Sequence, residues 1–240
     1  MTDLNINLQP NLRCCAEWGM LAEFGNRIDP ELNAWTRIVA ERLYRLSLQG
    51  IIEIVSAYAS FMVIYNPAEL EAEQLQQAIL DCCRHKSPEN YFSSGRTVEI
   101  PVCYHGAHAP DIENVARANN LSVQDVISIH SNTEYLIYML GFAPGFPYLG
   151  GLDQRLHTPR LETPRASLPA GSVGIAGSQT GIYPLSSPGG WQIIGRTPLQ
   201  LFNPHLEHPV PYYAPGDKLQ FRPISPQEFQ RLEQETNHGR

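Results

Sequence analysis

The run Pro169-Ala-Gly-Ser-Val-Gly-Ile-Ala-Gly-Ser-Gln-Thr-Gly-Ile-Tyr-Pro184, continued by Leu-Ser-Ser-Pro-Gly-Gly-Trp-Gln-Ile-Ile-Gly195, is the most informative part of this sequence. Glycine and proline interrupt short apolar runs at close intervals. That pattern is typical of short β-strands joined by tight turns, because glycine reaches turn conformations that other residues avoid and proline ends regular structure. Similar runs at Tyr135–Leu140 and Lys218–Phe221 extend the pattern outward. We therefore expect a β-barrel or a β-sandwich.

The frequency of proline and glycine changes sharply along the chain. Of the 20 prolines, 14 lie in residues 144–226, and of the 18 glycines, 11 lie in residues 141–195. The first part of the chain has ordinary turn composition instead. The shift predicts two domains, residues 1–95 and 96–240, joined near residues 87–95, where Ser, Pro, Asn and Gly cluster.

The first domain is expected to be a small α+β sandwich, one sheet with helices on one face. Asp29 precedes Pro30 and a run of apolar residues at helical spacing, which predicts a helix capped by Asp29. Asn66-Pro67-Ala68-Glu69 has the same pattern, with Glu69 placed for a capping box, and predicts a second helix. Runs rich in β-branched and aromatic residues predict the strands 12–15, 20–24, 51–55 and 61–65.

The second domain is expected to open with the strand Val98–Tyr104. Two short helices follow, one from Asp111 and one from Ser122, where Ser122-Val-Gln-Asp125 is a capping-box pattern. Beyond residue 134 the sequence predicts strands and turns. The expected strands are 135–140, 172–175, 191–194, 200–202 and 218–221.

Composition excludes several classes of protein. Lys and Arg number 17 against 24 Asp and Glu, giving a net charge of −7, and no basic cluster occurs, so neither nucleic acid nor a membrane surface is an expected partner. No apolar run is long enough to cross a bilayer, and the N-terminus has no signal-peptide pattern. The five cysteines lack metal-site spacing, so we expect reduced thiols, no metal site and a cytoplasmic location.

Familiar catalytic signatures are absent from the sequence. It has neither a phosphate-binding G-x-x-x-x-G-K-[ST] loop nor H-E-x-x-H. The glycines of 171–181 fit tight barrel turns better than a nucleotide site. Ser172 resembles a nucleophile elbow but lacks the helix that an elbow requires. His105 and His108 are interpreted as exposed loop residues.

The segment Leu156-His157-Thr158-Pro159-Arg160 is more suggestive. Pro159 stiffens a loop that carries an imidazole for proton transfer and a guanidinium for an anion. A turn in which both side chains only cap backbone groups explains the pattern equally well. Two rigid aromatic loops, 141–148 and 188–191, suit a small-molecule pocket, a contact between subunits, or the corners of a barrel.

Several segments together resemble the family of KipI and the B subunit of 5-oxoprolinase. The match follows the family in order over most of residues 97–223 and is looser before them. Its densest parts are Gly141-Phe-Ala-Pro-Gly-Phe-Pro-Tyr-Leu-Gly150, Leu156–Arg160, Pro169-Ala-Gly-Ser-Val-Gly-Ile175, Gln179-Thr-Gly-Ile-Tyr-Pro184 and Pro188-Gly-Gly-Trp-Gln-Ile-Ile-Gly195. The chain departs from the family at Tyr104-His105-Gly106, where a glycine pair is usual, and at Glu17-Trp18-Gly19.

The resemblance implies a cyclophilin-like β-barrel preceded by a small α/β domain. It also implies two partners of 5-oxoprolinase: a homologous barrel protein of the KipA type, which is the C subunit, and the A subunit. Together they would open 5-oxo-L-proline to L-glutamate with ATP as co-substrate, supplied with Mg²⁺ and without a tightly bound cofactor. Two other functions of the family stay open, inhibition of a sensor histidine kinase and a role within an enzyme that processes urea or allophanate.

Within that resemblance, individual residues are candidates for particular roles. His157 and Glu134 are the candidates for proton transfer. Arg160 and Arg196 are the candidates for contacts with anionic groups. The remaining candidates for substrate binding lie on or beside the glycine-rich stretch and are Gln179, Thr180 and Tyr183.

Overall fold

The computed structural model describes residues 9–84, 95–203, 205 and 211–238 of the chain. The chain divides into two compact units, residues 1–94 and 95–240, and each has its own hydrophobic core. Apart from Gly95, the expected link at 87–95 lies outside the described residues.

The first unit contains a four-stranded sheet with the order β1-β2-β4-β3, in which all neighbours are antiparallel. The strands confirm the four expected from the sequence within one or two residues at each end. They are β1 (Asn11–Cys15), β2 (Gly19–Glu23), β3 (Ile51–Ser56) and β4 (Ser60–Tyr65).

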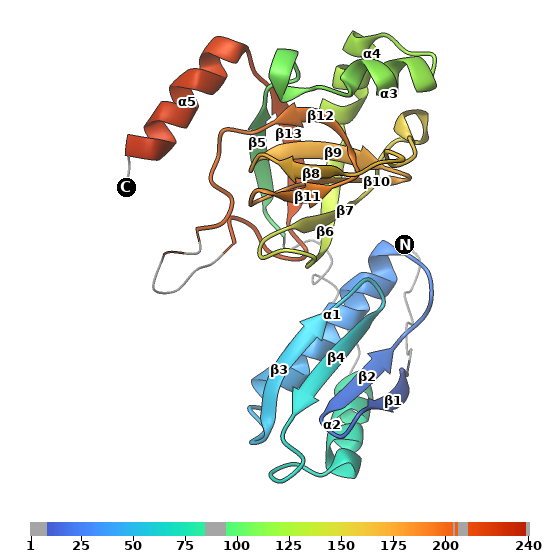
Figure 1. Cartoon of the computed structure of the whole chain (residues 1–240). Helices are drawn as coiled ribbons and strands as arrows, with labels where there is room; N and C mark the ends of the chain where they lie inside the picture. Colours follow the sequence, from blue (N-terminus) through green and yellow to red (C-terminus); the bar gives the residue numbers. More distant parts are fainter. Residues whose placement is uncertain (1–8, 85–94, 204, 206–210, 239–240) are drawn as a thin grey trace. The chain divides into compact units, whose positions relative to one another are not determined.

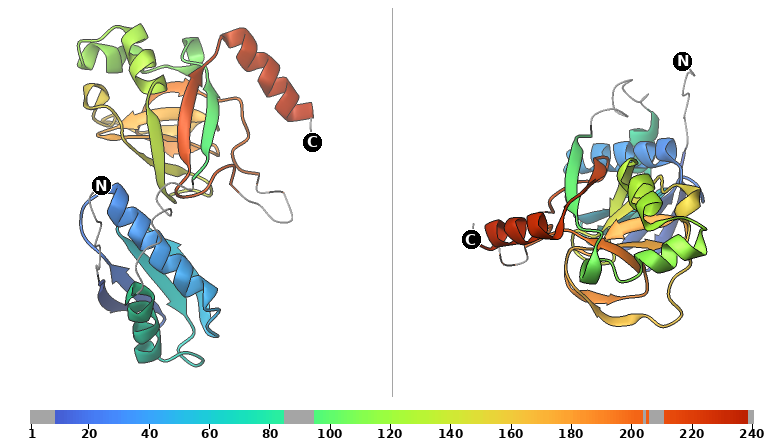
Figure 2. Two further views of the ribbon diagram at one scale, coloured as in Figure 1. Left: turned by 180° about the vertical axis from the view of Figure 1, so that it is seen from behind. Right: turned by 90° about the horizontal axis from the view of Figure 1, so that it is seen from above.

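Both helices of this unit, α1 (Pro30–Arg45) and α2 (Ala72–Arg84), cover the same face of the sheet (Figures 1 and 2). Asp29 caps α1 as expected, because its carboxylate accepts hydrogen bonds from the second and third backbone N–H groups of the helix. The predicted start of α2 at Asn66 is wrong. The Asn66 side chain accepts a hydrogen bond from the Ala68 N–H at 3.1 Å, which closes a separate turn before the helix begins.

The second unit is built on a seven-stranded sheet with the order β12-β9-β10-β7-β6-β13-β5. All neighbours are antiparallel except β13 and β5. Two backbone hydrogen bonds between Cys103 and Arg196, at 2.9 and 3.0 Å, join the two ends of the sheet and nearly close it into a barrel. The strands are β5 (Thr97–Val102), β6 (Glu134–Leu140), β7 (Pro147–Gly150), β9 (Ser172–Ala176), β10 (Gln179–Ile182), β12 (Gln192–Arg196) and β13 (Lys218–Pro223).

Shorter elements surround this barrel. The helices α3 (Ile112–Ala118) and α4 (Val123–Ser131) lie at one end of it, and Ser122 and Asp125 form the expected capping box of α4. A separate two-stranded sheet pairs β8 (Arg165–Leu168) with β11 (Ser187–Gly189). The C-terminal helix α5 (Pro226–His238) was not predicted.

The expected fold class, an α+β chain with a small first domain and a β-barrel domain, is confirmed. The predicted strand 200–202 is wrong, since those residues form no strand. The strands β7, β8, β10 and β11 were missed because each has only three or four residues, too few to show a hydrophobic period.

Candidate functional site

The loop that carries His157 and Arg160 is fastened to the barrel on one side through Thr158, which is 4% exposed. The Gly177 N–H donates to the Thr158 carbonyl at 2.7 Å, and the Asn119 side chain donates to its hydroxyl at 3.0 Å. The loop is thereby held against the turn between β9 and β10. Thr158 thus lies against the turn that precedes β10, the strand that begins with Gln179.

The other side of the loop is fastened to the segment that leads into β12. The Gln192 side chain donates to the Pro159 carbonyl at 3.1 Å, and the Leu161 N–H donates to the Gly190 carbonyl at 2.8 Å. These bonds flank Arg160 on both sides, so its backbone is fixed while its side chain is exposed. Of the two interpretations of Arg160, the structure therefore favours a guanidinium exposed for binding an anion, and it does not favour a side chain that only caps backbone groups of a turn.

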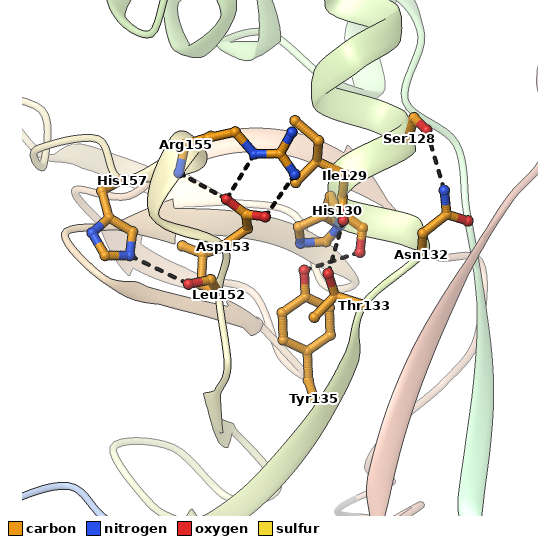
Figure 3. A network of polar contacts seen from close by, with 10 residues as sticks. All are labelled: Ser128, Ile129, His130, Asn132, Thr133, Tyr135, Leu152, Asp153, Arg155 and His157. Atoms are coloured by element: carbon orange, nitrogen blue, oxygen red, sulfur yellow. Dashed lines mark hydrogen bonds and ion pairs between the residues drawn. The ribbon is translucent and has the colours of Figure 1, made fainter.

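His157 is exposed and its Nε2 lies 3.3 Å from the Leu152 carbonyl oxygen (Figure 3). A carbonyl can only accept, so Nε2 donates to it, and in the neutral imidazole the lone pair lies on Nδ1. No hydrogen bond to Nδ1 occurs among the residues that the structure describes. In the neutral imidazole this nitrogen can accept a proton, as a general base must.

A polar hollow of about 440 Å³ lies near His157, at the end of α4. Two of its charged groups pair with each other, since Arg155 donates to both carboxylate oxygens of Asp153 at 3.0 and 2.7 Å (Figure 3). Those bonds lower the pKa of Asp153 to about 2, and the nearby His157 adds a small effect in the same direction. The hollow is lined by Leu121, Asp125, Ser128, Ile129, Asn132, Thr133, Asp153 and Arg155.

On the other side of the loop, Arg160 lies beside a cluster of aromatic side chains. Tyr183, 2% exposed, meets Trp191 edge to face at 6.2 Å between ring centroids, and Phe146 at 5.4 Å. Burial raises the pKa of Tyr183 to about 12, and the positive charge of Arg160 opposes that rise. Arg160 is therefore close enough to interact electrostatically with this phenol.

The contacts of the Thr180 side chain indicate a structural role. It is fully buried, and its hydroxyl donates to the Gly174 carbonyl at 3.0 Å, so it must accept at 2.9 Å from the Nε2–H of His130. The other His130 nitrogen accepts from the Tyr104 hydroxyl at 2.8 Å. Burial lowers the pKa of His130 to about 3, so the imidazole is neutral. This closed network leaves the Thr180 side chain no hydrogen for a substrate.

Arg196 and Glu134 also make contacts away from the loop. The Arg196 guanidinium donates to the Ala170 carbonyl at 2.9 Å and lies over the Phe229 ring of α5 at 5.4 Å, at the seam of the barrel. Glu134 accepts from Lys218 on β13 at 3.0 Å. The structure therefore places His157 and Arg160 on one loop, with Tyr183 beside Arg160, and Gln179 begins the strand after the turn that this loop contacts. No contact links Glu134 or Arg196 to that loop among the described residues.

Sequence reasoning assigned no role to His130, and it considered Phe142 only as part of the aromatic loop 141–148. His130 lies on an expected helix where only its burial distinguishes it from a surface histidine. Phe142, in contrast, adopts φ +65° and is 67% exposed, and the neighbouring Gly141 and Gly145 were the signal that could have drawn attention to its backbone.

Comparison with known proteins places this barrel and its preceding domain. Residues 10–212 match the family described as carboxyltransferase domain, subdomain C and D, and the chain belongs to that family. It is 42% identical to the B subunit of 5-oxoprolinase from Bacillus subtilis (strain 168), over 91% of this chain and 94% of that protein. It is likewise 42% identical to the B subunit of 5-oxoprolinase from Escherichia coli O157:H7, over 76% and 85%. These relatives confirm the resemblance found in the sequence.

Solved structures agree with this placement. A conserved uncharacterized protein from Pyrococcus horikoshii is 45% identical, with a TM-score of 0.54, over 91% of this chain and all of that one. The protein TTHA0988 is 35% identical with a TM-score of 0.76, and the match covers 86% of this chain but only 40% of that longer one. Kluyveromyces lactis urea amidolyase, 19% identical with a TM-score of 0.77, shares the fold.

In the part of the chain that the structure describes, no helix combines the length and apolar character needed to cross a membrane. Within the same part, no three His, Cys, Asp or Glu side chains come together as a metal site.

Proposed function

We propose that this chain is the B subunit of an ATP-dependent 5-oxoprolinase, which opens 5-oxo-L-proline to L-glutamate only when it is assembled with the KipA-like C subunit together with the A subunit. The observation that carries the proposal is the 42% identity to a 5-oxoprolinase protein of the same type along nearly the full length of both. ATP, with Mg²⁺, is the co-substrate of the assembly, and we assign no residue of this chain to it. We place the assembly in the cytoplasm, where ATP is supplied.

The need for partners is supported by the longer chains that contain this fold. In TTHA0988 the matching part makes up 40% of the chain, and in Kluyveromyces lactis urea amidolyase it makes up 16%. The same pair of domains therefore occurs joined to further polypeptide. Partner subunits would supply the equivalent of that polypeptide here.

The reaction needs activation because a lactam carbonyl is a poor electrophile. Transfer of the γ-phosphoryl group from ATP to the lactam oxygen would release ADP and create a leaving group. Water would then add to the carbon, and the ring C–N bond would break as nitrogen takes a proton, which leaves the side-chain carboxyl group as an acyl phosphate. A second water would hydrolyse this acyl phosphate to the carboxylate of glutamate and free phosphate. These steps call for a base beside the water and for donors to the phosphate oxygens.

The geometry sorts the candidate residues for these roles. We assign His157 to proton transfer through Nδ1, and Arg160 to an anionic group of the substrate. Tyr183 lies beside Arg160, Gln179 begins the strand after the turn that the loop contacts, and both remain candidates for positioning the substrate. We assign Thr180 and Arg196 to holding the barrel together, and Glu134 to its ion pair with Lys218.

The test is glutamate release from 5-oxo-L-proline and ATP by this chain purified together with the A and C subunits. Each of the three proteins is omitted in turn. We expect activity in the full assembly and none without this chain. A soluble full assembly that forms no glutamate would remove the proposal.

A urea-processing role is the second candidate, because urea amidolyase of Lachancea kluyveri is 24% identical over 98% of this chain. Urea and allophanate are therefore offered to the same assembly as alternative substrates. Inhibition of a sensor histidine kinase would be measured only if all three substrates fail.

A further inference from the structure

The backbone of Phe142 is held in a conformation that a bulky residue avoids. Its φ of +65° lies in the left-handed region, which costs free energy for any residue with a Cβ. Core packing does not explain the strain, because the Phe142 side chain is 67% exposed. Strained backbone conformations cluster at functional sites.

The loop around Phe142 is fixed by its own hydrogen bonds. The Gly141 N–H donates to the Phe146 carbonyl at 3.1 Å, and the Phe146 N–H donates to the Ala143 carbonyl at 3.0 Å. The buried Tyr213 hydroxyl donates to the Gly145 carbonyl at 3.0 Å. The backbone of the loop is therefore fixed by hydrogen bonds that do not involve the Phe142 side chain.

Phe142 and Arg160 flank the same buried aromatic pair. The Phe142 ring lies 5.5 Å from that of Phe146 and 6.4 Å from that of Tyr183, edge to face in both cases. Arg160 is fastened beside Trp191, whose ring meets both of these rings. An exposed aromatic side chain and an exposed cation thus border one aromatic surface.

Arg160 differs from the other arginines of the second unit. Within the described part of that unit, each of the others has a hydrogen bond or ion pair: Arg96, Arg117, Arg155, Arg165, Arg196, Arg222 and Arg231. Arg160 has none with a described residue. The backbone of Arg160 is fixed by the bonds of its neighbours, and its guanidinium is unpaired among the described residues, so this cation is available for a ligand anion.

We propose that Phe142 and Arg160 together determine which substrate the site accepts. The Phe142 ring packs on the cyclic amide of the substrate, and the Arg160 guanidinium binds the carboxylate of the same molecule. The inference rests on the proposed function and names how its substrate is recognised. A 5-oxoproline molecule offers one flat five-membered ring and one carboxylate. An aromatic face and a forked donor match these two groups.

The test is steady-state kinetics of the assembled complex carrying Arg160→Gln or Phe142→Ala. We expect KM for 5-oxoproline to rise about tenfold or more for Arg160→Gln, since a charge-assisted hydrogen bond is lost, with kcat changed much less. Phe142→Ala should raise the same KM, and Phe142→Tyr should restore it. KM for ATP should stay constant in every variant.

Matched controls separate recognition from folding. Arg117→Gln removes an exposed arginine of α3, and Tyr44→Ala removes an exposed aromatic side chain of α1, so both should keep wild-type KM. Phe142→Gly relieves the strained backbone, so it should keep or raise thermal stability while KM rises. A purely structural role for Phe142 predicts the reverse, a loss of stability with KM unchanged.

Three outcomes would overturn the inference. The first is an active wild-type complex whose Arg160→Gln and Phe142→Ala forms keep wild-type KM, which would leave the proposed function standing. The second is failure of Phe142→Ala to assemble with the partner proteins, which would place Phe142 in a contact between subunits. The third is an inactive wild-type complex, which would overturn the proposed function as well.

Discussion

Replacing Asp111 by Ala should destabilise the barrel more than any surface charge substitution. Asp111 is 2% exposed and accepts hydrogen bonds from both terminal nitrogens of Arg165, at 2.7 and 2.9 Å. One of its oxygens also accepts from the Ile193 N–H at 2.7 Å. A single carboxylate thus ties β8 to β12 and to the start of α3.

The magnitude follows from what the substitution leaves behind. Removing one partner of a buried ion pair costs about 3–5 kcal/mol, because the remaining charge keeps its desolvation penalty. Arg165 is one-third exposed and can partly regain water, which lowers that cost. The Ile193 N–H becomes unsatisfied in a buried strand and adds roughly 1–3 kcal/mol. We expect a loss of about 3–5 kcal/mol in the free energy of unfolding of the barrel.

The measurement is native-state hydrogen exchange of peptides from β9 and β12, which reports on the barrel without requiring the whole chain to unfold in one step. Glu235→Gln is the control, because it breaks an exposed ion pair on α5 and should cost less than about 1 kcal/mol. A loss below about 1 kcal/mol for Asp111→Ala would refute the reasoning that this carboxylate holds the barrel.

Three further outcomes are expected. Burial holds the pKa of His130 near 3 in the folded chain, below its unfolded value near 6.5. The neutral imidazole therefore contributes to stability above pH 6.5, and the free energy of unfolding should fall by about 2 kcal/mol between pH 7 and pH 5. Chemical denaturation of His130→Gln at the two pH values should lack this fall. Gly171→Ala places a Cβ against the Thr197 carbonyl oxygen at a φ of +83°, so it should lower Tm by several degrees. The control is Gly106→Ala, which has φ +58° and open space around it and should lower the free energy of unfolding by only about 1 kcal/mol. Burial raises the pKa of the Cys83 thiol to about 12, so mass spectrometry should find it unmodified by iodoacetamide at pH 8 until denaturant is added.

Local signals predicted the elements whose physics is local. The Asp29 cap, the Ser122 capping box and the alternating strands of the first sheet depend on residues within a few positions of one another. The same reasoning failed at Asn66, where two local options competed and the side chain closed a turn rather than a helix. It also placed a strand at 200–202, where no neighbouring strand is available for pairing among the described residues.

The candidate site was predicted in part. His157 and Arg160 stand out in the sequence because Pro159 stiffens the loop between them. Their surroundings could not be predicted there, since the hydrogen bonds that fasten the loop come from residues about 20 to 40 positions away.

Family membership, the fold class and the helix caps at Asp29 and Ser122 were thus contained in the order of the residues. The tertiary structure alone shows that Arg196 closes the barrel with Cys103, and that Thr180 completes a buried network with His130 and Tyr104. It also shows that Arg160 stays unpaired among the described residues. The physical reason is range: capping and strand alternation act over a few residues, whereas burial and the pairing of polar groups depend on which distant segments the folded chain brings together.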